Sequence, residues 1–233
     1  MTEDDPIALA AGILPQTFGR ARVSRIGQPV VEPIWLGRRV IAAATDQRAV
    51  IYEEGVPVDG QERIEARLTR MIAHTATGVI MDGYLTKQSA TAVLGAVMDT
   101  GVTIPTTAQL VTKAFIGIRR DRAGERIRRL DAEAAARQFD DDDIVNLVLT
   151  DLVWLDGEWL LDVPLLERKR LLEAVVVGDD LVRAGPYVQP PYETWIGSWR
   201  AQGFGGISFK EANSRYRPGE QASDWATSDM PRH

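Results

Sequence analysis

The sequence contains no cysteine and only two histidines, His74 and His233, among its 233 residues. The missing thiols exclude disulfides, thiolate zinc sites and cysteine nucleophiles, and two isolated imidazoles do not make a histidine metal site. A bound metal would therefore have to rest on carboxylates or on the phosphates of a substrate. We assign no metal ligands from the sequence.

Lysine is also scarce, since only four of the 27 basic residues are lysine: Lys87, Lys113, Lys169 and Lys210. Chemistry that needs a lysine amine must use one of these four side chains or the amino terminus. The arginine excess fits phosphate recognition and coding composition equally well. A net charge of -6 argues against a surface wholly devoted to nucleic acid, although local basic clusters matter more than the sum.

Long apolar runs are absent as well. No run approaches the roughly 20 residues that a membrane-spanning helix needs, and the first residues are acidic where a secretory signal is basic. The hydrophobic content of 45% and charged content of 26% are ordinary for a soluble globular protein. We expect a cytoplasmic protein that has no membrane partner.

Helical and strand patterns are interspersed without a regular βαβ rhythm, which predicts an α+β fold of mostly antiparallel sheets with flanking helices. We expect residues 1–30 to form an arm, residues 31–229 a single domain and residues 230–233 a tail. The polar stretch from residue 215 onward is expected to end in disorder. Strands are expected over residues 39–44, 48–52, 78–85 and 144–155, and helices over 62–72, 87–98, 119–139 and 165–177.

The most charged segment is the predicted helix over residues 119–139, which carries seven arginines and runs into four aspartates, Asp140 to Asp143. Adjacent side chains on an extended segment diverge, so the aspartate run favours a solvated turn over a metal cage. Either stretch could instead bind a partner protein, and such binding would weaken steeply with ionic strength.

Four segments resemble, in collinear order, the adenylation domain of the ATP-dependent DNA ligases, which are covalent nucleotidyltransferases. The resemblance extends over roughly residues 31–229. Residues 31–39 (VEPIWLGRR) resemble the family pattern EPKxDGxR, and residues 79–85 (VIMDGYL) resemble its DGEL strand. Residues 151–172 contain DLVWLDG and PLLERKRLL, similar to a strand, an Asp-Gly turn and the PLxERRxLL helix. Residues 204–225 contain FGGISFK, SRYRPG and DW, similar to EGxxxK, SxYxPGxR and the start of WxKxK.

The resemblance implies an ATP- and Mg²⁺-dependent activity on nicked or duplex DNA, used in DNA repair. It also implies that the nucleophilic lysine is missing, because its position is taken by Ile34. An aliphatic side chain has no lone pair with which to attack the α-phosphate of ATP. We therefore predict that the chain does not adenylate itself at this position.

Other positions depart from the family pattern too. The acidic positions that serve ribose contact and Mg²⁺ binding in the family are replaced, so the family's metal ligands are absent. The remaining nucleotide-binding candidates are Glu32, Ile34, Arg39 and Lys210, with Lys210 the one catalytic-type lysine that matches. The replaced positions are Leu36, Tyr84, Thr150, Gly205, Thr227 and Asp229.

Three functions remain open from these observations. The leading hypothesis is a ligase-like scaffold that binds DNA, a nucleotide or a protein partner without self-adenylation. The alternative is an active ligase that uses a displaced lysine, with Lys87 or Lys210 as the candidate. A structural or assembly role through the charged 119–143 region is the third. Trp35 either covers a bound base or fills the core, and we favour the core.

Overall fold

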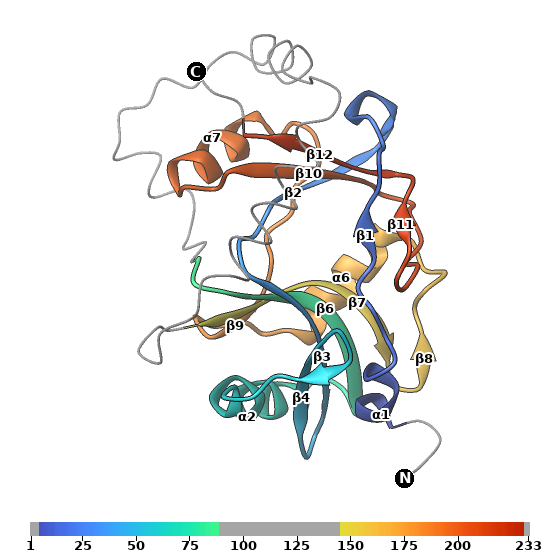
Figure 1. The fold of residues 1–233 in the computed structure, drawn as a ribbon, viewed down its shortest axis with the longest axis vertical. Helices are drawn as coiled ribbons and strands as arrows, with labels where there is room; N and C mark the ends of the chain where they lie inside the picture. Colours follow the sequence, from blue (N-terminus) through green and yellow to red (C-terminus); the bar gives the residue numbers. More distant parts are fainter. Residues whose placement is uncertain (1–4, 89–144, 231–233) are drawn as a thin grey trace.

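The computed structural model describes residues 5–88 and 145–230. The predicted helix over residues 119–139, the four aspartates and nearly all of the predicted 87–98 helix lie outside the described residues. The described part forms two stacked β-layers with helices around them, and most strand pairs are antiparallel (Figure 1). The predicted α+β class with mostly antiparallel sheet is confirmed.

The larger sheet has the order β5-β4-β3-β6-β7-β8, and β9 pairs in parallel with β7. The predicted hairpin over residues 39–52 is its β3–β4 pair, whose turn is closed by the Thr45 hydroxyl, which accepts from the backbone N–H groups of Gln47 and Arg48. The strands of this sheet are β3 (Arg38–Thr45), β4 (Ala49–Glu53), β5 (Val56–Pro57), β6 (Gly78–Thr86), β7 (Asn146–Leu155), β8 (Glu158–Trp159) and β9 (Val182–Ala184).

Both faces of this sheet are covered because its central strands are apolar on both sides. On β3, Val40 and Ala42 join one core cluster, and Ile41 and Ala43 between them join another, as the two-residue period of a strand requires. Helices α2 (Glu62–Ile72) and α6 (Leu165–Val175) cover the first face. Their four-residue spacing of buried side chains confirms the two helices predicted there.

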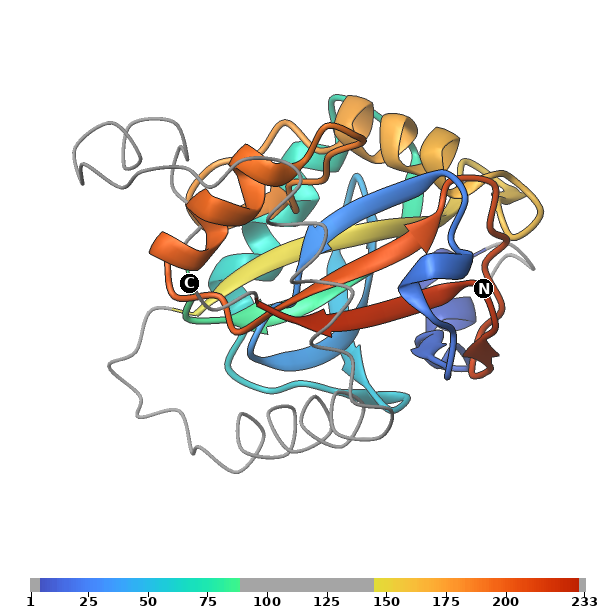
Figure 2. The same ribbon diagram turned by 90° about the horizontal axis from the view of Figure 1, so that it is seen from above.

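The second layer is the three-stranded sheet β12-β10-β2, formed by β2 (Pro29–Pro33), β10 (Gly206–Glu211) and β12 (Trp225–Asp229). Helix α7 (Glu193–Ala201) lies on its outer side, where Ile196 and Trp199 pack against Val31, Ile207 and Phe209 (Figures 1 and 2). Because side chains alternate along a strand, Glu32, Ser208 and Lys210 turn inward, toward the larger sheet.

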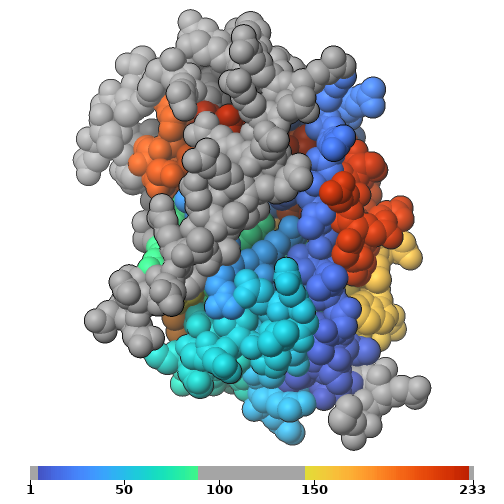
Figure 3. Space-filling view, viewed as in Figure 1, coloured from blue at the N-terminus to red at the C-terminus, as the bar shows by residue number. Residues whose placement is uncertain are grey.

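The N-terminal segment is integrated into the fold. Helix α1 (Pro6–Ala10) contributes Ile7 and Ala10 to the core on the second face of the large sheet, and η1 (Val23–Arg25) follows before β2. Strand β1 (Thr17–Phe18) pairs in parallel with β11 (Gln221–Ala222), so an N-terminal and a C-terminal segment lie side by side (Figure 3). The division of the chain at residues 30 and 31 stays a prediction.

The polar C-terminal stretch contains two strands that the sequence patterns did not predict, β11 and β12, and Trp225 is fully buried. The disordered end that was expected for this stretch falls on residues 231–233, which lie outside the described residues. The polar sequence is ordered because β12 pairs with β10 over five residue positions, a long-range contact that local composition does not encode. None of the described helices is long and apolar enough to span a membrane.

Candidate functional site

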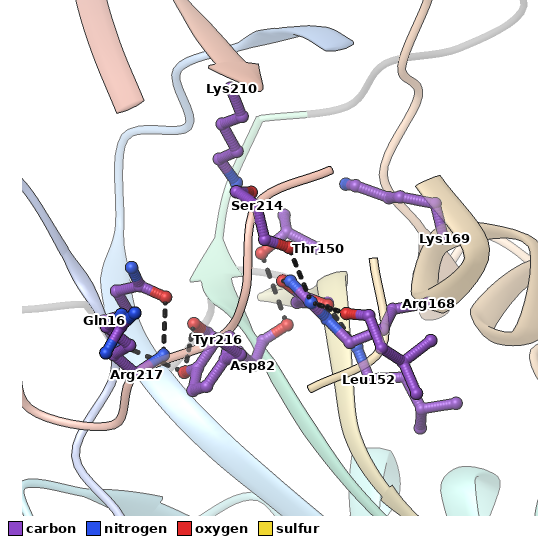
Figure 4. Close-up of polar contacts among 12 residues, drawn as sticks. Gln16, Asp82, Thr150, Leu152, Arg168, Lys169, Lys210, Ser214, Tyr216 and Arg217 are labelled. Carbon is purple, nitrogen blue, oxygen red and sulfur yellow. Dashed lines mark hydrogen bonds and ion pairs between the residues drawn. The ribbon is translucent and has the colours of Figure 1, made fainter. Parts of the chain in front are cut away.

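The residues that match the ligase motifs gather between the two sheets. Glu32 comes from β2, Lys210 from β10 and Lys169 from α6, so three distant segments place charged groups at one buried point. Figure 4 shows Lys210 extending down from its strand and Lys169 extending from its helix on the right, both above the polar groups around Asp82.

The Glu32 carboxylate holds both lysines. Its Oε2 lies 2.9 Å from Lys210 Nζ, and its Oε1 makes an ion pair with Lys169 Nζ. The side chains are at most 5% exposed, and the Lys210 ammonium also lies 4.4 Å from the centre of the Trp225 ring. Such a contact between a buried ammonium and an indole face is attractive. The site is therefore a compact cluster of two cations and one anion.

Burial and charge act in opposite directions on Glu32. Burial alone would raise the pKa of the Glu32 carboxyl, but the two adjacent ammonium groups lower it below its ordinary value overall. The pKa of Lys210 is lowered, because burial and the neighbouring Lys169 charge outweigh the attraction of Glu32. Glu32 is therefore an ionised counter-charge, shared between two lysines.

Ile34 occupies the position where the family pattern has its nucleophilic lysine. Its side chain is 7% exposed and packs over Gly206, where an added Cβ would come within 3.0 Å of Ile34 Cδ1. Its backbone N–H donates to the Gly206 carbonyl at 3.0 Å, which joins the end of β2 to the start of β10. The predicted nucleophile position is therefore a filled apolar contact.

A second polar group surrounds Asp82. Arg39 donates to both Asp82 oxygens, at 3.1 Å from Nε and 2.7 Å from Nη2, and the Tyr216 hydroxyl donates to Asp82 Oδ2 at 2.8 Å. The backbone N–H of Gln16 donates in turn to the Tyr216 oxygen. Burial and the Asp82 charge raise the pKa of Tyr216 well above its ordinary value. The guanidinium of Arg39, which was predicted to bind nucleotide, is thus paired with a carboxylate of this chain.

The third polar group joins α6 to β7. Arg168 makes a two-point ion pair with Asp151, Nε to Oδ1 at 2.8 Å and Nη2 to Oδ2 at 2.9 Å. Arg168 also donates to the Ser214 carbonyl at 3.2 Å, and the Ser214 hydroxyl accepts from the Trp225 indole N–H at 3.0 Å. This chain of contacts ties the helix that carries Lys169 to β12.

Sequence reasoning missed Lys169, Asp151, Arg168, Ser214 and Tyr216 as members of the site. All five lie inside the segments that carry the resemblance, but nothing in their local pattern says which charges meet. A detectable signal was the Arg-Lys pair on the otherwise apolar face of the 165–175 helix, because charged side chains are rarely buried there without partners.

The structure gives Lys87 a different setting. The flanking residues Thr86 and Gln88 both bond to Leu36: the Thr86 hydroxyl donates to its carbonyl, and the Gln88 amide oxygen accepts from its N–H, each at 2.6 Å. Lys87 itself is exposed, and it lies between two residues that are hydrogen-bonded to Leu36. Trp35 is 2% exposed and packs edge-on against Phe204, so the core interpretation is confirmed.

The positions that replace the family's acidic and cationic residues do not supply a nucleotide site. Tyr84 stacks near Arg39, and the Thr150 hydroxyl donates to the Asp82 carbonyl. Thr227 is half-buried on β12, and Asp229 is exposed at its end. No group of three or more metal-binding side chains occurs among residues 5–88 and 145–230. The described residues therefore do not fit Mg²⁺, and Arg39, Lys169 and Lys210 each have a carboxylate partner.

The glycines of the motifs have a packing reason to be there. A Cβ at Gly37 would lie 2.1 Å from the Leu85 carbonyl oxygen, and a Cβ at Gly83 would lie 2.4 Å from the Val148 oxygen. Both separations are far inside van der Waals contact, so only glycine lets these backbones approach. The matching residues thus include those that the fold itself requires.

No protein-family model matches the chain, and no curated protein matches its sequence. Solved structures do match. The ligase domain of LigD from M. tuberculosis superposes with a TM-score of 0.63 at 19% identity, over 94% of this chain and 60% of that one. A mycobacterial DNA ligase D complexed with ATP and MES gives 0.62 at 19% identity, over 93% and 60%. The ATP-dependent DNA ligase of bacteriophage T7, in complex with ATP, gives 0.52 at 14% identity, over 96% and 70%.

The chain spans about 60% of the length of the two ligase D structures. At this level of sequence identity the superpositions show a shared arrangement of helices and strands. They cover more than 90% of this chain. The curled antiparallel layers, the position of the motif residues between them and these superpositions agree. This chain has the fold of the nucleotidyltransferase domain of ATP-dependent DNA ligases.

Proposed function

We propose that this chain is a ligase-fold scaffold that does not adenylate itself and that binds nicked or duplex DNA in the cytoplasm, in DNA repair. One observation supports the proposal above others. The motif residues that remain are those with a packing or pairing role in the fold, whereas the residues that differ are those that would carry the chemistry.

The retained group includes Gly37 and Gly83, which the backbone packing requires, and Asp82, which binds Arg39 and Tyr216. The replaced group includes Ile34 at the nucleophile position and Leu36 two residues on. A sequence that keeps the packing residues and loses the lysine at the nucleophile position retains the shape of the domain. It lacks the amine that would form the bond to phosphorus. Binding of DNA through the outer surface does not need that amine.

The competing proposal is an active ligase that uses a displaced lysine. Lys169 and Lys210 do lie between the sheets, and this observation favours them over the exposed Lys87. Both ammonium groups are ion-paired to Glu32, however, and an ammonium has no lone pair until it loses a proton. We therefore keep the non-adenylating scaffold as the proposed function.

Two measurements on the full chain test the proposal. Incubation with α-labelled ATP and Mg²⁺, followed by denaturation, is expected to leave no label on the protein, and a stoichiometric lysine-linked adenylate would overturn the first half. Gel shifts with nicked and intact duplexes are expected to show binding that weakens with salt. Absence of binding to either duplex at low ionic strength would overturn the second half.

A further inference from the structure

The Glu32 cluster has more positive than negative charge. Two lysines and one carboxylate are all but excluded from solvent. A further carboxylate whose charge acts on Lys210 is that of Asp151, and both of its oxygens are already bound by Arg168. Burying unbalanced charge is costly, so two buried cations normally call for more than one shared anion.

The hydrogen bonding of Lys169 is incomplete. Beyond its ion pair with Glu32, its ammonium has no hydrogen-bond acceptor among the described residues, although it carries three donors. The remaining close group is the Tyr187 ring, whose centre lies 5.3 Å from the nitrogen. Converging ammonium groups with unused donors are the chemistry that binds the oxygens of a phosphate.

We propose that Lys169 and Lys210 form an oxyanion-binding pair whose occupant is this chain's own Glu32 carboxylate, which excludes the phosphates of a nucleotide or of pyrophosphate. The inference rests on the proposed function, since it gives a ligase fold that does not adenylate itself a means of excluding nucleotide phosphates. It makes Glu32 an internal ligand that closes the space between the sheets.

The position of Glu32 supports this role. It lies on β2 two residues before Ile34 and opposite Ser208, so its side chain occupies the inward face beside the filled nucleophile position. The carboxylate is ionised, which lets it form ion pairs with both cations at once. An external phosphate would have to displace a tethered anion that pays no entropy of association.

The decisive variant is Glu32→Gln, which keeps the side-chain size and removes the charge. It leaves two buried ammonium groups without a carboxylate, so affinity for inorganic pyrophosphate and for ATP, both without Mg²⁺, is expected to rise by about tenfold or more over the wild type. Calorimetric titration gives the affinity. Tryptophan fluorescence gives a second signal, to which Trp225 contributes because its indole lies against Lys210.

Two variants serve as controls. Glu53→Gln removes a carboxylate that pairs with Arg38 and is 33% exposed, so it makes the same charge change outside the cluster. No gain in anion affinity is expected from it. The double variant Glu32→Gln with Lys169→Met removes one cation as well, and is expected to lose most of the gained affinity. A gain that persists without Lys169 would overturn its part in the site.

Glu32→Gln removes the anion that pairs with two buried lysines, so folding is measured in parallel by circular dichroism. If the variant is unfolded in buffer, pyrophosphate is expected to restore its native spectrum where sodium chloride of equal ionic strength does not. A well-folded variant without a gain, an unfolded variant that pyrophosphate does not rescue, or a wild type that binds equally tightly would each overturn the inference. A covalent adenylate on the wild type would instead defeat the proposed function, so the two failures are distinguishable.

Discussion

Arg168 and Asp151 form a two-point ion pair in which neither side chain is more than 1% exposed. The pair connects α6 to the centre of β7. Because it is shielded from solvent, loss of one partner strands the other as a buried, uncompensated charge. Loss of one partner of this pair is therefore expected to destabilise the fold more than loss of one partner of a surface ion pair.

Arg168→Met should lower the free energy of unfolding by about 3–5 kcal/mol, the usual cost of breaking a buried pair from one side. Urea unfolding followed by circular dichroism measures it. Arg38→Met is the matched control, since Arg38 pairs with Glu53 at a site where both are about 30% exposed. That variant should change stability by about 1 kcal/mol or less. Equal losses in the two variants would contradict the assigned importance of burial.

Gly37→Ala tests the packing role of a motif glycine. The new methyl group would meet the Leu85 carbonyl oxygen, so β3 and β6 must move apart and stability should fall by about 1–3 kcal/mol or more. Gly197→Ala is the control, because Gly197 lies in α7 and nothing is within 4 Å of its added Cβ. Alanine there should stabilise by up to about 1 kcal/mol. A tolerated Gly37→Ala would remove the packing explanation for this glycine.

Ile34→Lys restores a lysine to the nucleophile position. We expect no covalent adenylate from this change alone, because Glu32 still holds Lys169 and Lys210 and the described residues supply no Mg²⁺ cluster. Placing an ammonium at a position that is 7% exposed should cost about 1–3 kcal/mol of stability. α-Labelled ATP and urea unfolding measure the two effects. Efficient adenylation by this single variant would show that the rest of the site is intact.

The tyrosines give a prediction at alkaline pH. Burial, together with the Glu173 carboxylate that accepts from its hydroxyl at 3.0 Å, raises the pKa of Tyr187 to about 12. An unfolded tyrosine titrates near pH 10. The folded value is the higher one, so the contribution of Tyr187 to stability is complete below about pH 10 and is lost as the pH rises toward about 12.

Absorbance of the tyrosinate band in native and urea-unfolded protein checks this titration. Native protein should need higher pH to ionise its tyrosines, and Tyr187→Phe should remove one late component. The variant also loses the Glu173 contact without leaving a buried polar group, so it should remain folded. The pKa of Tyr216 is also raised, so late ionisation is not expected to vanish entirely. An unchanged late titration in Tyr187→Phe would contradict the assignment.

Local periodicity was sufficient for much of the fold. The β3–β4 hairpin, the β6 and β7 strands and helices α2 and α6 follow from alternating or helically spaced apolar residues, which reflect burial against a neighbouring layer. Strand β12 was missed because its sequence, WATSD, is polar and short. Its order comes from pairing with β10, and a pairing partner cannot be read from the strand that needs it.

The candidate site, like the fold, was predictable from the sequence only in part. Its replaced nucleophile could be recognised from one position, Ile34, because the chemistry of a single side chain is decisive. The polar contacts of the site could not be predicted from the sequence. Tyr216 and Asp82, for example, are 134 residues apart and come into contact only in the folded chain. Lys169 in particular has no local sign that it shares Glu32 with Lys210.

The parallel pair of β1 with β11 bears on how this protein can be shortened. Gly19 lies so close to the Ala222 carbonyl that an added Cβ would be 2.1 Å from its oxygen, and α1 seals the same side of the large sheet with Ile7 and Ala10. A polypeptide that starts at residue 31 would leave Trp225 and Tyr216 beside an open apolar surface. Such a fragment should aggregate on expression, whereas one that starts at residue 5 should stay in solution.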